Sequence, residues 1–251
     1  MTQATTRTVF ARYVALGDSM SIDDYPVIDW QERHGLSAPV PGLGASSLLY
    51  HNNDDVWPAF RGLDLHTSSP AMAHECLATD GARTRDVLAN QLPQLEARDS
   101  QPTLVTLTAG GNDLLDVLRG QTAPEPADAI LGRIEEILAR LERLFPDRTV
   151  LVGTVYDPTD GGPDLMGVRL GERERGLLAR VNEGIRDLCS ARASTILADV
   201  AAHFHGHGLS APPAHRWYWE EAPIEPSAMG ASELRRLWLK LLGVQTPLAL
   251  R

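Results

Sequence analysis

A serine stands directly after the first apolar run of the sequence. Residues 9–16 are largely apolar and are followed by Gly17, Asp18 and Ser19. We therefore expect a buried strand that ends just before the serine hydroxyl. Sites in open parallel sheets lie beyond the carboxyl ends of the strands. A serine at that point can act as a nucleophile, although Gly, Asp and Ser are also common turn residues.

Two further segments carry groups that could stabilise an oxyanion beside this serine. Gly81 lies in the run Asp-Gly-Ala-Arg-Thr at an expected strand-to-helix junction, where its amide could point at a ligand. Gly110 and Gly111 follow the strand-like run 103–108 and allow close backbone approach, and Asn112 adds a side-chain amide. Together with the serine amide, these groups would offer three donors around one oxygen, as a tetrahedral intermediate requires.

In this order, the segments resemble the SGNH subgroup of the GDSL esterase/lipase family. The matching residues are 17–19, Gly81 in its context, and 110–113. The resemblance implies a flavodoxin-like three-layer α/β/α sandwich with a central parallel sheet, and a nucleophile at Ser19. It also implies an oxyanion hole made by the amides of Ser19 and Gly81 and the side chain of Asn112. Members of this family hydrolyse esters, thioesters or acetylated sugars without a metal.

The fourth motif of that family is altered in this sequence. The family carries Asp-x-x-His-Pro ahead of a glycine in the last helix, and the histidine and aspartate supply the general base and the group that orients it. Here the stretch 221–230 keeps the proline and the glycine, but Glu225 replaces the histidine and Ala222 replaces the aspartate. A carboxylate with an ordinary pKa of about 4.3 is a weaker base at neutral pH than an imidazole at about 6.5.

Three interpretations are compatible with this change. Burial, with repulsion from the glutamates at 220 and 221, could raise the pKa of Glu225 so that it accepts the Ser19 proton itself. Alternatively, a histidine of the preceding loop reaches Ser19 and Glu225 orients it; the candidates are His203, His205, His207 and His215. In the third interpretation the protein binds an ester or a carbohydrate without hydrolysing it.

Our functional prediction is hydrolysis of a carboxylic ester, including acetyl and acyl esters, through an acyl-serine step. The predicted site residues are Ser19, Gly81, Asn112 and Glu225. The alternative is a catalytically impaired binding protein of the same fold. We expect a small-molecule ester as the partner and no cofactor. A metal at the histidines of 203–207 is less favoured than an exposed polar loop, because no carboxylate or thiolate stands beside them at ligand spacing.

Apolar strand-like runs alternate with segments of helical period, which predicts right-handed βαβ units in one α/β domain, residues 1–251. We expect helices over 127–145 and 172–189, a last helix capped by Ser227, and strands over 9–16, 103–108, 149–154 and 195–200. The stretch from Asp24 to Leu65 is rich in Pro, Gly, Asn and Asp, which predicts a long irregular loop. This loop is expected to shape the pocket, and the aromatic segment 216–219 is expected either to wall the pocket or to bury loop surface against the sheet.

Composition narrows the class of protein. The 251 residues include 23 Lys+Arg and 33 Asp+Glu, for a net charge of −10, and Lys240 is the single lysine. This balance argues against nucleic-acid binding. No apolar run approaches the roughly 20 residues of a membrane span, and no signal-peptide pattern opens the sequence, so we expect a cytoplasmic protein. Cys76 and Cys189 are expected to be buried, reduced thiols. The oligomeric state stays open.

Overall fold

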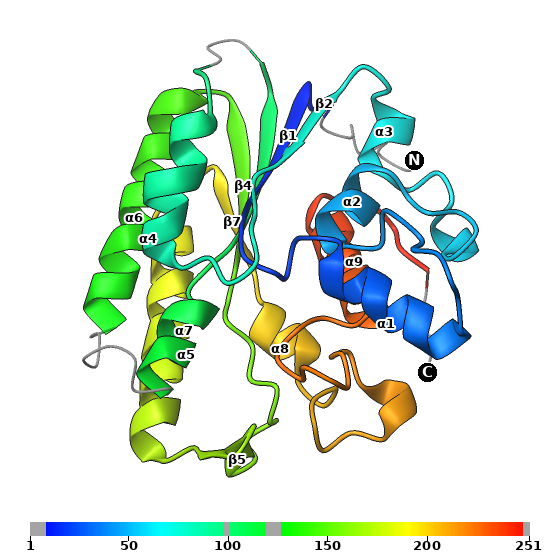
Figure 1. Cartoon of the computed structure of the whole chain (residues 1–251). Helices are drawn as coiled ribbons and strands as arrows, with labels where there is room; N and C mark the ends of the chain where they lie inside the picture. Colours follow the sequence, from blue (N-terminus) through cyan, green and yellow to red (C-terminus); the bar gives the residue numbers. More distant parts are fainter. Residues whose placement is uncertain (1–8, 98–100, 119–126, 248–251) are drawn as a thin grey trace, which may run out of the picture.

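The computed structural model describes residues 9–97, 101–118 and 127–247, and within them five parallel strands form the central sheet (Figure 1). The sheet order is β2-β1-β3-β4-β7, which is the flavodoxin-like order. The strands are β1 (Arg12–Gly17), β2 (Ala73–Cys76), β3 (Thr103–Thr108), β4 (Arg148–Gly153) and β7 (Thr195–Ala198). A short antiparallel pair, β5 (Asp164–Leu165) and β6 (Val168–Arg169), lies outside this sheet.

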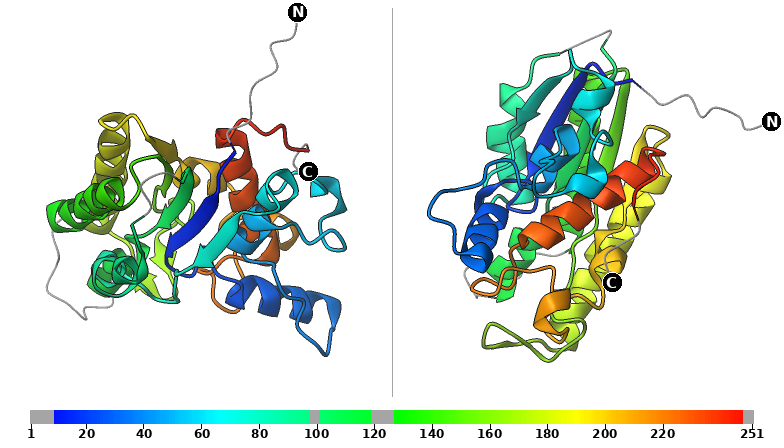
Figure 2. Two further views of the ribbon diagram at one scale, coloured as in Figure 1. Left: turned by 90° about the horizontal axis from the view of Figure 1, so that it is seen from above. Right: turned by 90° about the vertical axis from the view of Figure 1, so that its right-hand side faces the viewer.

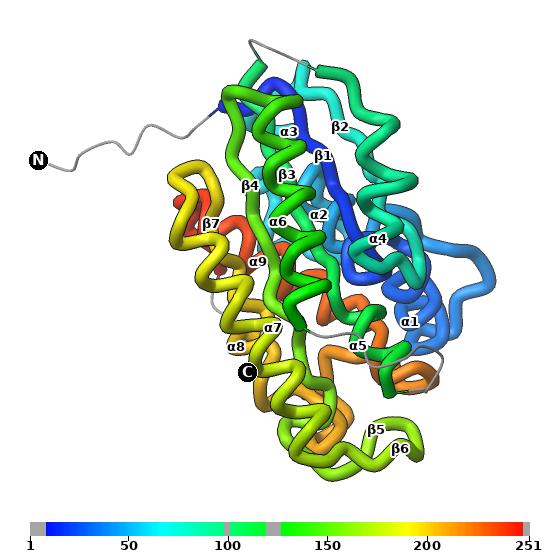
Figure 3. Tube along the Cα trace, turned by 90° about the vertical axis from the view of Figure 1, so that its left-hand side faces the viewer, coloured from blue at the N-terminus to red at the C-terminus, as the bar shows by residue number. Residues whose placement is uncertain are grey.

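Helices cover both faces of the sheet, so the expected three-layer α/β/α sandwich is confirmed (Figure 2). One layer holds α4 (Thr84–Asp86), α5 (Gly111–Leu118), α6 (Ala127–Leu144) and α7 (Glu172–Ser190) (Figure 3). The opposite layer holds α1 (Asp24–His34), α2 (Ala45–Tyr50), α3 (Leu65–Ser68), α8 (Val200–Phe204) and α9 (Ala228–Leu241).

The first strand shows why the sheet is buried on both faces. Successive side chains of a strand point to opposite sides. Tyr13 and Ala15 pack into the core under α9, whereas Val14 and Leu16 pack into the core under α6. Both cores exclude water, which explains why the strand sequences are apolar without alternation.

The long helices follow their sequence pattern closely. In α6 the apolar stripe expected from the sequence is buried, with Ile130, Ile134 and Ile137 each at most 1% exposed. The predicted cap of the last helix is also confirmed, because the Ser227 hydroxyl accepts a 3.1 Å hydrogen bond from the amide of Gly230.

The expectation of an irregular loop between Asp24 and Leu65 is wrong, because α1 and α2 both lie within that stretch. The helix α1 tolerates Pro26 in its first turn, where amides have no helical partner, and it ends at Gly35 in the left-handed conformation, with φ of 60°. Only Pro26 and Asp29 of this helix are buried. It therefore lacks the apolar period by which the other helices were predicted.

The two cysteines differ in exposure. Cys189 is buried at the end of α7, as expected, but Cys76 is exposed, so the expectation is wrong for this residue. Cys76 ends the edge strand β2, whose residues are exposed or half-buried. In the described part of the chain no helix has the length and apolarity needed to cross a bilayer.

Candidate active site

The sheet order brings the three predicted motifs together. β1 lies between β2 and β3, and all three strands run in the same direction. Ser19 follows β1, Gly81 follows β2, and Asn112 stands in the first turn of α5 after β3. Parallel strands end at one edge of the sheet, so these residues lie at the same edge, as the strand pattern predicts.

The turn that carries Ser19 begins at Gly17, and this position requires glycine. Gly17 has a φ of 121°, and a Cβ atom there would lie 1.8 Å from the carbonyl oxygen of Thr108. On the other side, the Gln91 side chain donates to the Gly17 carbonyl and accepts from the Gly17 amide, both at 2.8 Å. The backbone just before Ser19 is thus held from two directions. Ser19 itself is 5% exposed.

Asn112 and the Gly81 loop are joined directly. The Asn112 side-chain nitrogen donates a 3.1 Å hydrogen bond to the carbonyl of Ala82, next to Gly81. The following residue, Asp113, accepts hydrogen bonds from the amide of Thr84 at 2.9 Å and from its hydroxyl at 2.7 Å. These contacts hold the start of α5 against the loop that follows β2.

Glu225 lies in the loop before α9, and backbone hydrogen bonds hold that loop. The Glu225 amide donates to the Ala222 carbonyl at 2.8 Å, and the Glu225 carbonyl accepts from the amide of Trp219 at 2.9 Å. The hydroxyl of Tyr156, from the segment after β4, donates to the carbonyl of Ile224. The hydrogen bond to Ile224, the residue before Glu225, thus ties this loop to the segment that follows β4.

The pKa values of two tyrosines are raised in part by the charge of Glu225. Burial, and then the charges of Glu225 and Asp18, hold the pKa of Tyr156 well above its usual value. Burial, and then the charges of Glu225 and Asp80, raise the pKa of Tyr25 to about 12. The charge of Glu225 also acts on Asp18, which precedes Ser19.

Asp18 is a functional candidate that the sequence reasoning missed. It is 6% exposed, and its carboxylate accepts a 3.2 Å hydrogen bond from the amide of Met20. Burial raises its pKa to about 7; hydrogen bonds from Thr108 and Met20 oppose the shift, and the charge of Glu225 adds to it. A buried carboxyl adjacent to a nucleophile is the signal that could have identified it.

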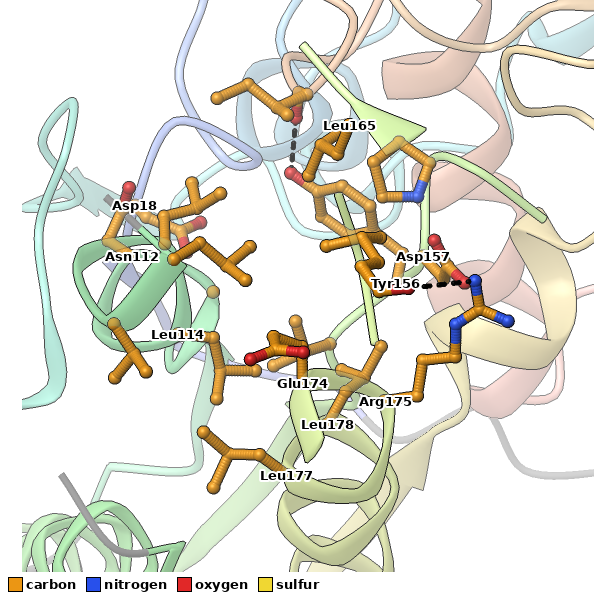
Figure 4. Close-up of a pocket in the computed structure, with 18 of the residues that line it drawn as sticks. Asp18, Asn112, Leu114, Tyr156, Asp157, Leu165, Glu174, Arg175, Leu177 and Leu178 are labelled. Carbon is orange, nitrogen blue, oxygen red and sulfur yellow. Dashed lines mark hydrogen bonds between the residues drawn. The ribbon is translucent and has the colours of Figure 1, made fainter. Parts of the chain in front are cut away.

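One open cavity connects most of these groups; the space among its lining residues is about 820 Å³, which includes open solvent at its mouth. Ser19, Asn112 and Glu225, three of the four predicted site residues, line it together with Asp18. Figure 4 shows Asp18 and Asn112 at one side of this cavity. Gly81 does not line the cavity. The next residue, Ala82, accepts the hydrogen bond from Asn112, which does line it. A serine, an asparagine and two acidic residues thus line a cavity whose remaining wall is mainly aliphatic.

The four loop histidines do not line this cavity, and the imidazoles of three of them have contacts elsewhere. His203 lies 3.1 Å from the carbonyl of Glu233, and His207 lies 2.8 Å from the carbonyl of His215 and stacks on Trp217. His205 lies 3.6 Å from an Asp160 carboxylate oxygen. The residues described contain no group of three or more His, Cys, Asp or Glu side chains that could hold a metal ion.

The expected sources of the pocket wall are also wrong. Neither the stretch 24–65 nor the segment 216–219 lines the cavity. Trp217 and Tyr218 are 8% and 2% exposed and pack into the core beneath α9. In this segment these two aromatic side chains bury apolar surface in the core and do not line the cavity.

Comparison of the structure with solved structures identifies several enzymes of the same architecture. A putative GDSL-like lipase from Parabacteroides merdae ATCC 43184 matches with a TM-score of 0.63 and 12% identity, over 94% of this chain and 96% of the other. Phospholipase A1 from Streptomyces albidoflavus NA297 matches with a TM-score of 0.56 and 22% identity, over 93% and 98%. The acetylxylan esterase Axe2 from Geobacillus stearothermophilus matches with a TM-score of 0.59 and 15% identity, over 96% and 97%.

These identities establish a shared fold. A sequence comparison with curated proteins found no match. The sequence establishes the family, because residues 15–231, which are most of the chain, match the sequence model of one protein family. This range contains all four predicted site residues. The chain belongs to the GDSL-like Lipase/Acylhydrolase family.

Proposed function

We propose that this protein hydrolyses carboxylic esters, with Ser19 as the nucleophile and Glu225 as the base. The observation that carries the proposal is that Ser19, Asn112 and Glu225 line one cavity in a chain of this family. The amides of Ser19 and Gly81 and the side chain of Asn112 would hold the oxyanion.

In this mechanism the oxygen of Ser19 attacks the ester carbonyl carbon, and its proton passes to the carboxylate of Glu225. The carbonyl electron pair moves onto oxygen, giving a tetrahedral intermediate. When the carbonyl re-forms, the alkoxy group leaves and takes the proton back from Glu225, and the acyl group stays on Ser19. Water then attacks the acyl-serine and gives a proton to Glu225. When the second tetrahedral intermediate collapses, the bond to Ser19 breaks, Glu225 returns the proton to the Ser19 oxygen, and the carboxylic acid is released.

The position of Asp18 supports a role for Glu225 as the base. Asp18 and Glu225 line the same cavity, and the charge of Glu225 contributes to the raised pKa of Asp18. Two neighbouring carboxylates favour the uptake of a proton, which is what a carboxylate base requires. The contacts of the loop histidines favour Glu225 further, because His203, His205 and His207 are engaged away from the cavity.

A binding protein of the same fold is the second candidate function. It is favoured by one observation, the glutamate at position 225 in place of the family's histidine. A serine-reactive phosphonate separates the two candidates because it forms a stable adduct only with an activated hydroxyl.

The experiment treats the protein with an alkyl phosphonate ester and maps the adduct by mass spectrometry. Modification of Ser19 in the native protein, and its absence in Ser19→Ala, is the expected result. Hydrolysis of p-nitrophenyl esters by the native protein but not by Ser19→Ala should accompany it. No adduct under conditions that modify a known serine esterase would refute the proposed nucleophile.

A further inference from the structure

The cavity beside Ser19 extends well beyond the reacting groups. From the polar residues Asp18, Ser19, Asn112 and Glu225 it continues between α5, α7 and the β5–β6 hairpin. The walls of this extension are dominated by leucine side chains, among them Leu114 and Leu118 of α5, Leu165 and Leu170 of the hairpin region, and Leu177 and Leu178 of α7. Figure 4 shows Leu114, Leu165, Leu177 and Leu178 around the same space.

Helix α5 provides a scale for the length of this extension. It runs from Asn112, at the reacting end, to Leu118, over six residue steps. A helix rises 1.5 Å per residue, so this wall is about 9 Å long, close to the length of an extended acyl chain of roughly eight carbons. An acetyl group would reach only its beginning and would leave most of the leucines in contact with water.

The charges of the cavity wall favour an uncharged chain. Among the described lining residues Arg175 is the only cation; it is exposed, and it donates a 2.9 Å hydrogen bond to the carbonyl of Gly162. The other charged groups of the wall, Asp157 and Glu174 besides the pair at the reacting end, are acidic. A second carboxylate on the acyl chain would therefore be repelled.

We infer that this leucine-lined extension is an acyl pocket, and that the protein prefers esters of medium-length acyl chains over acetyl esters. The inference rests on the proposed reaction at Ser19 and adds the substrate class. Its physical basis is burial of apolar surface in a cavity that continues directly from the nucleophile. Each methylene buried contributes about 0.8 kcal/mol, which is roughly a fourfold gain in kcat/KM.

A series of p-nitrophenyl esters from acetate to dodecanoate tests the preference. We expect kcat/KM to rise about fourfold per methylene until the pocket is filled, and then to level off or fall. The rate of Ser19 labelling by alkyl phosphonates of increasing length should follow the same order. Acetate hydrolysed as efficiently as octanoate would overturn the inference while leaving the hydrolase intact. If no ester is cleaved and no phosphonate reacts at Ser19, the proposed function itself fails.

Two substitutions on separate elements test where the chain lies. Leu177→Trp and Leu170→Trp each place an indole into the extension, and each should lower the ratio of octanoate to acetate efficiency at least tenfold. The matched control is Leu36→Trp, because Leu36 is 41% exposed just beyond α1 and does not line the cavity. It should keep the native ratio. Circular dichroism identifies any variant that fails to fold, and an unchanged ratio in a folded Leu177→Trp or Leu170→Trp protein would overturn the pocket assignment.

Discussion

Gln91 holds the backbone of Gly17 through two hydrogen bonds of 2.8 Å, one to its carbonyl and one from its amide. Gln91 is 1% exposed and comes from the short helical segment after β2. Its carboxamide donates one hydrogen bond and accepts one, as the backbone of a neighbouring strand would, at the point where β1 ends. The turn that presents Ser19 is therefore fixed by a side chain far away in the sequence.

Replacing Gln91 with leucine should weaken both the fold and the nucleophile. The variant leaves the Gly17 amide without the acceptor it has in the native protein, which should lower the free energy of unfolding by about 1–3 kcal/mol. Urea denaturation measures this loss, and the rate of phosphonate labelling at Ser19 should fall with it. Gln94→Leu is the control, since Gln94 is exposed and its side chain donates to the Asn90 carbonyl, away from Gly17. Equal effects of the two substitutions would show that the Gly17 contact is unimportant.

Replacing Glu225 with glutamine should remove the base. We expect kcat for a p-nitrophenyl ester to fall by about 100-fold or more, because a carboxamide cannot accept the serine proton. Thermal unfolding should confirm an intact fold. Glu221→Gln, at an exposed position four residues earlier, should keep native activity. Undiminished hydrolysis by Glu225→Gln would exclude Glu225 as the base, and a matching loss in His205→Ala or His215→Ala would then favour a loop histidine.

The buried carboxyl of Asp18 should make stability depend on pH. Its pKa is raised from 3.8 to about 7 in the folded protein, chiefly by burial. Between these values the folded state binds more protons than the unfolded state, so stability should fall as pH rises from about 4 to about 7. Measured by urea denaturation, the slope should be reduced in Asp18→Asn and retained in Asp55→Asn, whose parent residue is exposed. The same slope in both variants would contradict the assignment.

Two glycines should respond in opposite directions to alanine. Gly17→Ala places a Cβ 1.8 Å from the Thr108 carbonyl oxygen at a φ of 121°, and should cost roughly 3 kcal/mol or more. Gly132→Ala, within α6, meets nothing within 4 Å and should add about 0.5–1 kcal/mol of stability. Chemical denaturation of both variants tests the pair. A tolerated Gly17→Ala would mean that β1 and β3 can separate at the active-site edge.

Much of the fold could be predicted from the sequence because the responsible forces are local. Apolar runs without alternation predict strands covered on both faces, and the stripe of α6 predicts its buried side. The strand before Gly81 was expected without its correct bounds, and α1 was missed, for a related reason. The edge strand β2 has no buried residue, and α1 buries only Pro26 and Asp29, so neither carries an apolar signal.

The sequence by itself determined the order of the motifs, and with it the strand ends at which Ser19, Gly81 and Asn112 stand. Only the tertiary structure decided which groups surround them. The cavity wall combines α5, α7 and the β5–β6 hairpin, and the charge state of Asp18 depends on its burial and on Glu225. Dielectric environment and cavity shape arise from segments far apart in the chain, and no local pattern of residues encodes them.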